Sequence, residues 1–488
     1  MMLRTTRDVL FANPAIEPDK TAIIFDGRRV SYDELRRRVA ATAHALCREG
    51  VRFGDRVAVL LDNQPEFLEC YYAITSIGAV FVPLNWRLHP SEHVSLLNSA
   101  EAVLLIAGSE FAKSALAVRD SVHSVRQVIL VGDGQPALPR FENWIAAIDG
   151  TRGDVSDMPS GREPRPEDWA ALVFTSGTTS QPKGVMLAHR NYMADIDNVA
   201  HAFKPDRDSI NLQLTPIYHA SNVFSLMHLA HGATTILERG FEPDRTLALV
   251  QRYGVTFFFA VPTMLYRMLD LPDRDGYDIS SLKLLSYGAA PITGGRLVQV
   301  LEFFGPRVCH SYGLTETTSH SSILLAPDQM RAEGSIGKGL KGAELRVVDE
   351  LEHDVGAGEI GELIVRGDNI MLGYYNMPEE TGRTIADGWL HTGDLGHIAP
   401  DSGCLIITGR RKSMIVLKSG KKVFPEEIEF LFGQYESIKE SLVWGELEPG
   451  GDVMVNAKIV LDRDQLKQEG MNEADEAALK SRLDTIIG

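Results

Sequence analysis

The stretch 54–85, GDRVAVLLDNQPEFLECYYAITSIGAVFVPLN, decides the fold class of this chain. Its run RVAVLL at 56–61 has the β-branched, apolar composition of a buried strand. Asn63 then stands as a possible helix cap, and Pro65 opens a helical stretch that leads into VFVPL at 80–84, a second strand. A strand, a helix and a strand in this order predict parallel strands covered by helices.

The same pairing of a short apolar run with an amphipathic run recurs from about Asp55 to Arg307. VTFFFAVP at 255–262 precedes TMLYRMLD, and LKLLSYGAA at 282–290 precedes the helix-like RLVQVLEFF and the strand-like RVCHSYG. We therefore predict an α/β fold with a large N-terminal domain of parallel sheets and flanking helices, over residues 1–409.

The composition changes over about 334–409, where closely spaced glycines separate the short alternating runs AELRVVD, GEIGELIVRG and GCLIITG. This pattern predicts an antiparallel, β-barrel-like subdomain within the N-terminal domain. The basic tetrad GRRK at 409–412 follows, and the helix-like PEEIEFLF comes soon afterwards. We place the edge of a hinge at 410–411 and a small, mobile α/β C-terminal domain at 412–488.

The overall composition favours small-molecule chemistry. With 488 residues, of which 44% are apolar, the chain can form more than one core. Its formal net charge of -17 disfavours nonspecific binding to nucleic acid or to an anionic membrane. No stretch reaches the roughly 18 apolar residues of a membrane span, so we expect a cytoplasmic protein, either monomeric or homodimeric. Four widely spaced cysteines predict buried free thiols and neither a disulfide framework nor a zinc site.

A loop rich in hydroxyl groups follows the strand-like ALVF. It consists of Thr175, Ser176, Gly177, Thr178, Thr179, Ser180, Gln181, Pro182, Lys183 and Gly184. Glycine lets backbone N–H groups turn toward an anion, hydroxyls add neutral donors, and a lysine supplies a point charge. The loop therefore predicts a phosphate site, although it lacks the lysine order of a Walker A loop. The run GKGLKG at 337–342 matches GxGxxG but precedes a strand-like run, which favours a turn.

This loop, TSGTTSQPKG, resembles the signature of the AMP-forming adenylating superfamily, which includes acyl-CoA synthetases, luciferases and adenylation domains of peptide synthetases. Other blocks similar to those of the family occur in the expected order: the stretch 54–85, TPIYH at 215–219, SYGAAP at 286–291, YGLTET at 312–317, HTGDLG at 391–396, GRRK at 409–412 and VFPEEIE at 423–429. The resemblance spans nearly the whole chain. It implies an ATP-dependent acid–thiol ligase that uses Mg²⁺ and takes CoA as co-substrate.

Carried over by position, the resemblance implies an ATP site. Its expected residues are Thr175, Ser176, Gly177, Thr178, Thr179, Lys183, Tyr287, Gly288, Ala289, Ala290, Tyr312, Gly313, Thr315, Asp394 and Arg410. The loop 175–183 would cradle the phosphates, and the segment 287–290 with Tyr312 would flank the adenine. Asp394 would bind both ribose hydroxyls, and Arg410 would help from the edge of the hinge.

The resemblance also implies the catalytic groups. Thr315 would bond the α-phosphate, and Glu316 would hold Mg²⁺, because that ion prefers hard oxygen ligands. His219 would lie beside the acyl carboxylate and the thiol tunnel. Lys183, His219, Thr315 and Glu316 are therefore the expected catalytic set. A substrate carboxylate is already ionised at neutral pH, so the reaction needs positioning and charge neutralisation more than a general base.

The expected two-step reaction depends on rotation of the C-terminal domain between the adenylation and thioester steps. Lys412 matches the hinge position, and Gly420 matches the loop that lines the pantetheine tunnel after rotation. The family also carries a late lysine in a segment like PKTxxGK, and this chain ends at Gly488 before any such segment. The C-terminal domain is therefore expected to be truncated, or the protein to lack that lysine.

The acid is left open by the sequence. The mostly apolar run NVFSLMHLAHGA at 222–233 favours a medium- or long-chain fatty acid, provided that it lines the site. Aryl acids remain an alternative, because the same run could pack in the core. A non-catalytic nucleotide- or acyl-binding protein that lacks the late lysine is a second alternative. A stand-alone adenylation module that feeds a separate carrier protein is a third.

Overall fold

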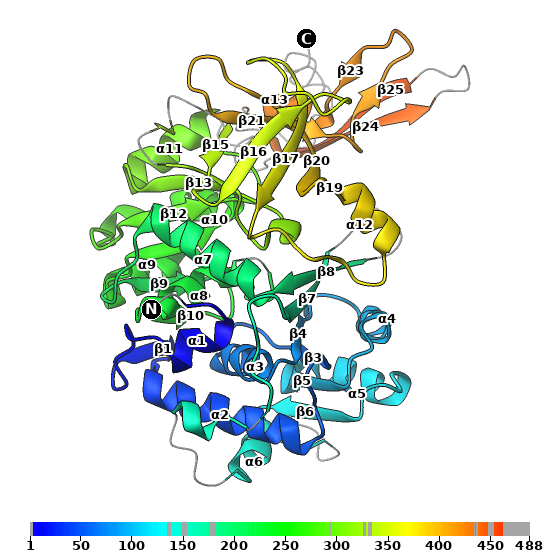
Figure 1. Ribbon diagram of the computed structural model, residues 1–488. Coiled ribbons are helices and arrows are strands. Elements are labelled where there is room, and N and C mark those ends of the chain that lie inside the picture. Colours follow the sequence, from blue (N-terminus) through cyan, green and yellow to red (C-terminus); the bar gives the residue numbers. More distant parts are fainter. Residues whose placement is uncertain are drawn as a thin grey trace.

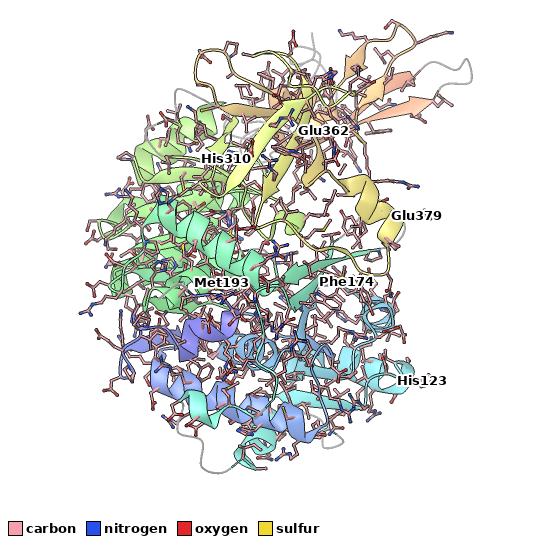
Figure 2. The ribbon with its side chains drawn as sticks, in the orientation of Figure 1. His123, Phe174, Met193, His310, Glu362 and Glu379 are labelled. Atoms are coloured by element: carbon pink, nitrogen blue, oxygen red, sulfur yellow. The ribbon has the colours of Figure 1, made fainter. Side chains whose placement is uncertain are left out.

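The computed structural model describes residues 3–133, 138–148, 154–159, 161–175, 182–219, 221–292, 294–325, 328–329, 334–433, 435, 438–447 and 453–461. Figure 1 shows an elongated molecule in which the N-terminal, blue part lies at one end and the orange part, close to the C-terminus, lies at the other. Two large sheets run through it, and side chains fill the space between sheets and helices (Figure 2).

The first sheet has seven strands in the order β18-β8-β7-β4-β3-β5-β6. Their bounds are β3 Arg56–Leu60, β4 Val80–Pro83, β5 Leu104–Gly108, β6 Gln127–Val131, β7 Trp169–Thr175, β8 Lys183–Ala188 and β18 Gly373–Tyr374. β3 pairs in parallel with both β4 and β5, and helix α3 (Pro65–Ser76) connects β3 to β4. The strand–helix–strand unit expected from the opening stretch is therefore confirmed. Further helices are α4 Pro90–Ala100, α5 Ala112–Ser121 and α6 Phe141–Ala146, with 3₁₀ turns η1 Ser109–Phe111 and η2 Val155–Asp157.

The second sheet has fourteen strands, and its central part is parallel. The parallel ladder joins β1 (Thr21–Phe25), β10 (Thr234–Leu237), β9 (Ile210–Gln213), β11 (Phe257–Ala260), β12 (Leu284–Tyr287) and β13 (Val308–Tyr312), in that order. β2 (Arg28–Ser31) lies antiparallel at the edge. The helices of this region are α1 Thr6–Phe11, α2 Tyr32–Arg48, α7 His189–Phe203, α8 Asn222–Ala230, α9 Pro243–Tyr253, α10 Pro262–Leu269 and α11 Gly294–Phe304, with 3₁₀ turns η3 Arg274–Gly276 and η4 Thr315–Thr317.

Beyond β13 the same sheet becomes antiparallel, as the glycine-rich sequence predicted. The strands are β14 Ser322–Leu324, β15 Ser335–Gly339, β21 Leu405–Arg410, β20 Trp389–Ile398, β17 Gly361–Gly367 and β16 Ala343–Val348, with the short β19 Ile385–Ala386 paired to β20. Helix α12 (Pro378–Thr384) precedes β19. Among the described residues no ladder joins β16 back to β15, so this antiparallel part continues the large sheet as an open order.

The last described segment has a small core of its own. It comprises β22 Ile415–Val416, β23 Lys422–Val423, α13 Pro425–Phe432, β24 Ile438–Leu447 and β25 Val453–Leu461. Phe432, Ile438 and Val443 form its buried centre. In the described part of the chain, no helix has both the length and the apolar character needed to cross a membrane.

Asn63 has a different role from the predicted helix cap. The residue before α3 is Gln64, whose side chain makes no capping bond. The buried Asn63 amide instead donates to the carbonyls of Thr215 and Glu238 at 3.0 and 2.9 Å, and its oxygen accepts from the Ile217 N–H at 2.8 Å. The prediction was wrong because a buried amide saturates its donors and acceptors wherever backbone groups approach it, here from the other sheet.

Two further expectations from composition need correction. All four cysteines are free, but Cys47 is exposed, whereas the other three are buried. The apolar run at 222–233 forms α8, and most of that helix packs in the protein core, with Val223, Leu226 and Met227 all at most 2% exposed. The apolar character of this run is therefore explained largely by core packing.

Gly337 lies in β15, at a close approach to β14 within the antiparallel part of the large sheet. Its φ is +79°, and a Cβ built there would lie 2.2 Å from the carbonyl oxygen of Ile323 in neighbouring β14. Gly27, in the β1–β2 turn, has the same φ of +79° but nothing within 4 Å of its built Cβ. Both glycines therefore need a left-handed backbone, but only Gly337 also lacks room for a side chain.

We predict that Gly337→Ala destabilises the protein far more than Gly27→Ala. The left-handed backbone alone costs an alanine about 1 kcal/mol, whereas the added clash with a neighbouring strand brings Gly337→Ala to about 3 kcal/mol or more. Chemical denaturation of both variants measures the difference. Equal losses for the two variants would show that the close approach at Gly337 does not constrain the sheet.

Candidate active site

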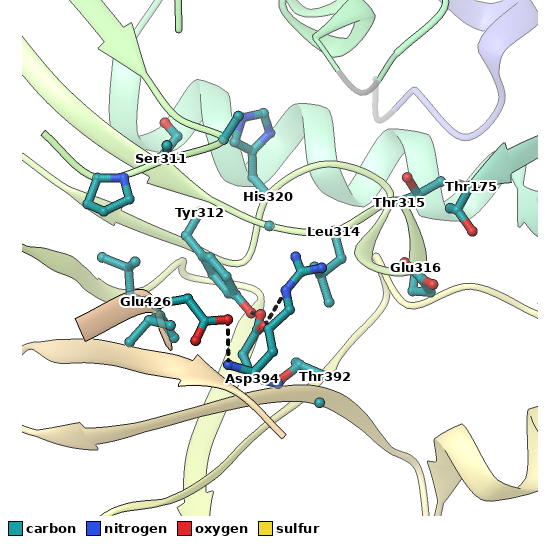
Figure 3. A pocket seen from close by; sticks show the side chains of 18 of the residues that line it. Thr175, Ser311, Tyr312, Leu314, Thr315, Glu316, His320, Thr392, Asp394 and Glu426 are labelled. Carbon is teal, nitrogen blue, oxygen red and sulfur yellow. Dashed lines mark hydrogen bonds and ion pairs between the residues drawn. The ribbon is translucent and has the colours of Figure 1, made fainter. Parts of the chain in front are cut away.

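A cavity of about 1710 Å³ lies where the carboxyl ends of parallel strands from both sheets meet the antiparallel strands. Twelve of the residues expected from the sequence line it: Thr175, Lys183, His219, Ala289, Ala290, Tyr312, Gly313, Thr315, Glu316, Asp394, Arg410 and Lys412. Ser176, Gly177, Thr178 and Thr179 lie outside the described residues. Figure 3 shows part of this cavity, with Thr175, Thr315 and Glu316 near one another.

The two ends of the predicted phosphate loop are held together by strand pairing. Thr175 ends β7, Lys183 begins the antiparallel β8, and the two residues are directly paired. The Thr175 hydroxyl donates to the Lys183 carbonyl at 3.5 Å. The sequence indicated a strand before the loop but gave no sign that the lysine itself opens the returning strand. This pairing fixes where the lysine side chain leaves the backbone.

Lys183 is held by an acidic and an aromatic partner. Its ammonium group forms an ion pair with Glu380 of α12 and lies 4.7 Å from the centre of the Tyr374 ring. The Tyr374 hydroxyl in turn donates to Glu316 at 2.8 Å. A hydrogen bond from Lys183 lowers the pKa of Glu380, so that carboxylate is ionised at neutral pH. A phosphate that binds Lys183 must therefore compete with Glu380.

The segment that follows β13 is shaped by close backbone contacts. A Cβ built at Gly313 would lie 1.8 Å from the carbonyl oxygen of Ser319, so no side chain fits there. The chain then forms η4, which presents Thr315 and Glu316 to the cavity. The backbone N–H of Met371 donates to the Glu316 carbonyl at 2.9 Å, which ties η4 to the segment before β18.

Tyr287 and Gly288 differ in position from the neighbouring Ala289 and Ala290. Tyr287 is 2% exposed, and its ring stacks on His310 at 4.5 Å with 4° between the planes. His310 lines the cavity, whereas Tyr287 and Gly288 are not among its lining residues. A Cβ at Gly288 would lie 2.6 Å from the Ser311 carbonyl oxygen, which explains the glycine by close packing of β12 and β13.

Asp394 is the most buried carboxylate that lines the cavity, and two groups hold it. The side chain of Asp394 is 5% exposed, its Oδ2 accepts from the Tyr312 hydroxyl at 2.6 Å, and Arg410 Nε lies 3.2 Å from its Oδ1. Burial raises the pKa of Asp394, while the hydrogen bond from Tyr312 and the charge of Arg410 oppose that rise. Burial and the Asp394 charge also raise the pKa of Tyr312, so the phenol keeps its proton and acts as donor.

The residues around the predicted hinge contact both neighbouring parts of the chain. The Arg410 N–H donates to Glu426 of α13 at 3.3 Å, and Arg411 pairs with Glu362 of β17 at 3.2 Å. Lys412 is exposed and lines the cavity. Gly420, with φ of +81°, lies exposed in the turn between β22 and β23, away from the cavity-lining residues.

His219 lies in the loop after β9 and lines the cavity. Its ring packs against Tyr218 with 4.3 Å between centroids. Partial burial and the positive charge of Arg87 both lower the pKa of His219, so the imidazole is neutral at neutral pH. Arg87 follows β4 and also lines the cavity, with its guanidinium 4.7 Å from the Trp86 ring centre.

Several cavity residues escaped the sequence analysis. They are Arg87, Phe259, His310, His320, Glu362, Tyr374 and Glu380. A histidine, arginine or glutamate outside a recognisable motif has no local signature that separates a site residue from an ordinary surface or core residue. Tyr374 ends β18 and Glu380 lies in α12. Neither belongs to a recognisable motif, so no signal in the sequence could have linked them to Lys183.

Glu316 has the carboxylate chemistry that a single protein ligand for Mg²⁺ needs. One of its oxygens accepts from Tyr374, and it lines the cavity together with Lys183 and Thr315. Mg²⁺ bound to a nucleotide uses one or two carboxylates and otherwise water and phosphate oxygens. In the described part of the chain no cluster of three or more metal-ligating side chains is present. The donor set therefore fits an ion that arrives with a polyphosphate.

Comparison with known proteins finds one matching family and several relatives of similar length. The family described as AMP-binding enzyme matches residues 10–375. The chain is 33% identical to an indoleacetate–CoA ligase of Aromatoleum aromaticum over 92% of this chain and 86% of that protein. It is 30% identical to the fatty acid–[acyl-carrier-protein] ligase ScoC of Streptomyces coeruleorubidus, over 91% of this chain and 84% of that one.

The crystal structure of the anthranilate CoA ligase AuaEII with anthranoyl-AMP superposes with a TM-score of 0.87 at 24% identity, covering 99% of this chain and 90% of that one. This likeness shows the fold and confirms the predicted α/β class. The family match and the two relatives confirm the resemblance that the sequence motifs indicated, and the chain belongs to the AMP-binding enzyme family.

Proposed function

We propose that this protein is an acid–thiol ligase that uses ATP and Mg²⁺ to activate an aromatic carboxylic acid and then transfers the acyl group to CoA. The observation that carries the proposal is the convergence of Lys183, Glu316 and Asp394 on one cavity. In the first step a carboxylate oxygen attacks the α-phosphorus, the bond to the β-phosphate oxygen breaks, and pyrophosphate leaves. In the second step the CoA sulfur attacks the acyl carbonyl carbon, and AMP leaves.

Each part of the nucleotide has a candidate partner. Lys183 and Thr175 would face the β- and γ-phosphates, and Thr315 would bond the α-phosphate. Ala289 and Ala290 lie along one face of the adenine. Asp394 accepts from the ribose hydroxyls, because a carboxylate has about four lone-pair sites and Tyr312 and Arg410 use two of them.

Charge neutralisation replaces general-base catalysis in this scheme. The acid is ionised at neutral pH, so it attacks without losing a proton. Glu316 would hold Mg²⁺, and the bound ion together with Lys183 would offset the negative charge that repels the carboxylate. The neutral His219 positions the carboxylate by hydrogen bonding and adds no charge.

The segment after Arg410 is proposed to move between the two steps. Its own small core would let it rotate as a unit about Lys412. Gly420, now in an exposed turn, would then approach the cavity and line the path of the pantetheine arm. The Arg410–Glu426 contact crosses the hinge and would break in such a rotation, whereas Arg411 and Glu362 both precede Lys412 and could stay paired.

Two observations support an aromatic acid over an aliphatic one. From the apolar run at 222–233 only Phe224 lines the cavity, so the main argument for a fatty acid loses its basis. Phe224 and Phe259 stack with 5.2 Å between centroids and 28° between planes, and both rings line the cavity. Paired aromatic faces form a flat wall, which suits a planar acid.

A panel of acids tests this proposal. Purified full-length protein is incubated with ATP, Mg²⁺ and CoA and with benzoate, phenylacetate, cinnamate, hexanoate or decanoate, while pyrophosphate, AMP and thioester are followed separately. We expect all three products with at least one aryl acid and a higher kcat/KM for it than for either straight-chain acid. A preference for decanoate would overturn the aromatic acid but not the ligase.

The same preparation with chemically made cinnamoyl adenylate and CoA isolates the second step. If the protein forms thioester from the adenylate but releases no pyrophosphate from ATP with any acid, it lacks the adenylation step and retains the thioester step. ATP binding with neither half-reaction would contradict the ligase and favour a non-catalytic binding protein.

We predict that substitutions at the two ends of the Lys183–Glu380 ion pair change the use of ATP in opposite directions: the first slows the reaction, and the second improves the apparent affinity for ATP. Lys183→Ala should slow pyrophosphate release about 100-fold, because it removes a fixed contact to developing charge. Glu380→Gln should lower the KM for ATP by roughly two- to fivefold, because the phosphates no longer compete with a carboxylate in a partly exposed pair.

Glu379→Gln is the matched control for Glu380→Gln. Glu379 lies on the same helix, is 90% exposed, and faces Arg383 at 3.9 Å (its position is labelled in Figure 2). Its loss should leave the KM for ATP unchanged. A raised KM in Glu380→Gln would mean that Glu380 helps to bind the metal–nucleotide complex and does not compete with it.

A further inference from the structure

A buried acid–base pair lies in the wall of the cavity and takes no part in the scheme above. It consists of His320, which follows η4 and is 4% exposed, and Asp195 of α7, which is completely buried. His320 lines the cavity. Its Nδ1 lies 3.5 Å from Asp195 Oδ2, and its backbone N–H donates to Asp195 Oδ1 at 3.1 Å.

These two side chains have only each other as polar partners at their facing atoms. Among the described residues, neither His320 Nδ1 nor Asp195 Oδ2 has a hydrogen-bond partner, and both atoms are buried. Leaving either atom uncompensated would cost about 1–3 kcal/mol, so their contact is the available compensation. Burial raises the pKa of Asp195, and the hydrogen bond that Asp195 accepts from the His320 backbone N–H counters that rise.

The backbone around His320 is fixed. Asn369 donates from its side chain to the carbonyls of His320 and Thr317 at 2.8 and 3.1 Å. Thr318 adopts φ of +66°, which is strained for a β-branched residue, and its hydroxyl donates to the Asn369 carbonyl at 2.7 Å. The Phe224 ring packs against the imidazole with 4.8 Å between centroids. The imidazole is therefore held in one place before any substrate arrives.

The geometry also sets the tautomer. Asp195 already accepts from the His320 backbone N–H, so as a carboxylate it offers a second acceptor to the ring. In a neutral ring, a proton on Nδ1 would face the Asp195 carboxylate, and Nε2 would keep its lone pair. Figure 3 shows His320 near the backbone end of Tyr312, whereas Asp394 binds the hydroxyl at the other end of that side chain.

We propose that His320, oriented by Asp195, accepts a hydrogen bond from a hydroxyl or amino substituent on the aromatic body of the acid. This inference rests on the proposed function and narrows it to acids that carry such a donor. His320 would touch the substrate and set specificity, whereas Asp195 acts through His320 as a positioning residue. A site built around a buried acceptor disfavours the analogue that leaves the acceptor unpaired.

Cinnamate and its ortho-, meta- and para-hydroxy and methoxy derivatives test the proposal by kcat/KM for pyrophosphate release. At one ring position the hydroxy acid should exceed both cinnamate and the methoxy acid by about tenfold, because only the hydroxyl can donate to Nε2. His320→Phe keeps a ring against Phe224 and should abolish the preference of hydroxy acid over cinnamate.

Asp195→Asn distinguishes a positioning role of Asp195 from a merely structural one, because only a positioning role predicts a change in substrate selectivity. The asparagine oxygen would remain on the His320 backbone N–H, so its NH₂ would face Nδ1 and shift the ring proton to Nε2. A donor at Nε2 serves hydroxyl and methoxy oxygens alike. The ratio of hydroxy to methoxy acid should therefore fall about tenfold, with the change in KM rather than in kcat.

His93→Gln is the control for loss of a buried histidine. His93 is fully buried, contacts Ser114 and the Asn85 carbonyl at 3.1 and 2.9 Å, and does not line the cavity. The His93→Gln variant should show the same ratios of hydroxy acid to cinnamate and of hydroxy acid to methoxy acid as the wild type. Turnover of cinnamate without preference for any hydroxy acid would overturn the role of His320 while leaving the ligase intact. Absence of product from every acid would remove the proposed function as well.

Discussion

The carboxyl ends of parallel strands from two sheets open onto one cavity, and every group of the site depends on that arrangement. Arg87 follows β4, His219 follows β9, Ala289 follows β12, and Thr315 follows β13. Thr175 ends β7, which lies parallel to β4. In open α/β sheets the loops beyond the carboxyl ends can vary without disturbing the core, which makes this edge the usual place for ligands. The buried amide of Asn63 ties the two sheets together beside it.

Charge in the cavity is balanced within the protein when no ligand is bound. Lys183 faces Glu380, Arg410 faces Asp394, and Arg411 faces Glu362. A protein with a net charge of -17 keeps these cations in place by pairing each with a carboxylate. An anionic ligand therefore has to replace a carboxylate as the partner of each cation. Its affinity depends on how much stronger the new ion pair is than the old one, and salt weakens both pairs.

The antiparallel half of the large sheet supplies the acidic and basic groups of the remaining cavity wall. Asp394 on β20 reaches Tyr312 at the end of β13, and Arg410 at the end of β21 reaches Asp394. Arg410 also contacts Glu426 of α13. Glu426, Glu427 and Leu431 of α13 also line the cavity, so the small last segment forms part of the cavity wall.

The sequence by itself determined the order of elements, the parallel class and the motif residues, because these depend on short-range patterns. The alternation in 54–85 and the glycine-rich loop before Lys183 are both readable within ten to thirty residues. The structure brings the described members of these motifs to one cavity. Tyr287, Gly288 and Gly420 are exceptions that do not line it. Tyr287 packs behind His310, because whether an aromatic ring lines a site or fills a core depends on its neighbours.

Only the tertiary structure decided how Asn63, α8 and the His320–Asp195 pair are used. Asn63 bonds to residues 152 and 175 positions away, and His320 bonds to a residue 125 positions away. Such contacts have no local signature, since a buried polar side chain is satisfied by whatever the fold brings within hydrogen-bond distance. The apolar run of α8 is ambiguous for the same reason, because burial in a core and burial against a substrate favour the same residue types.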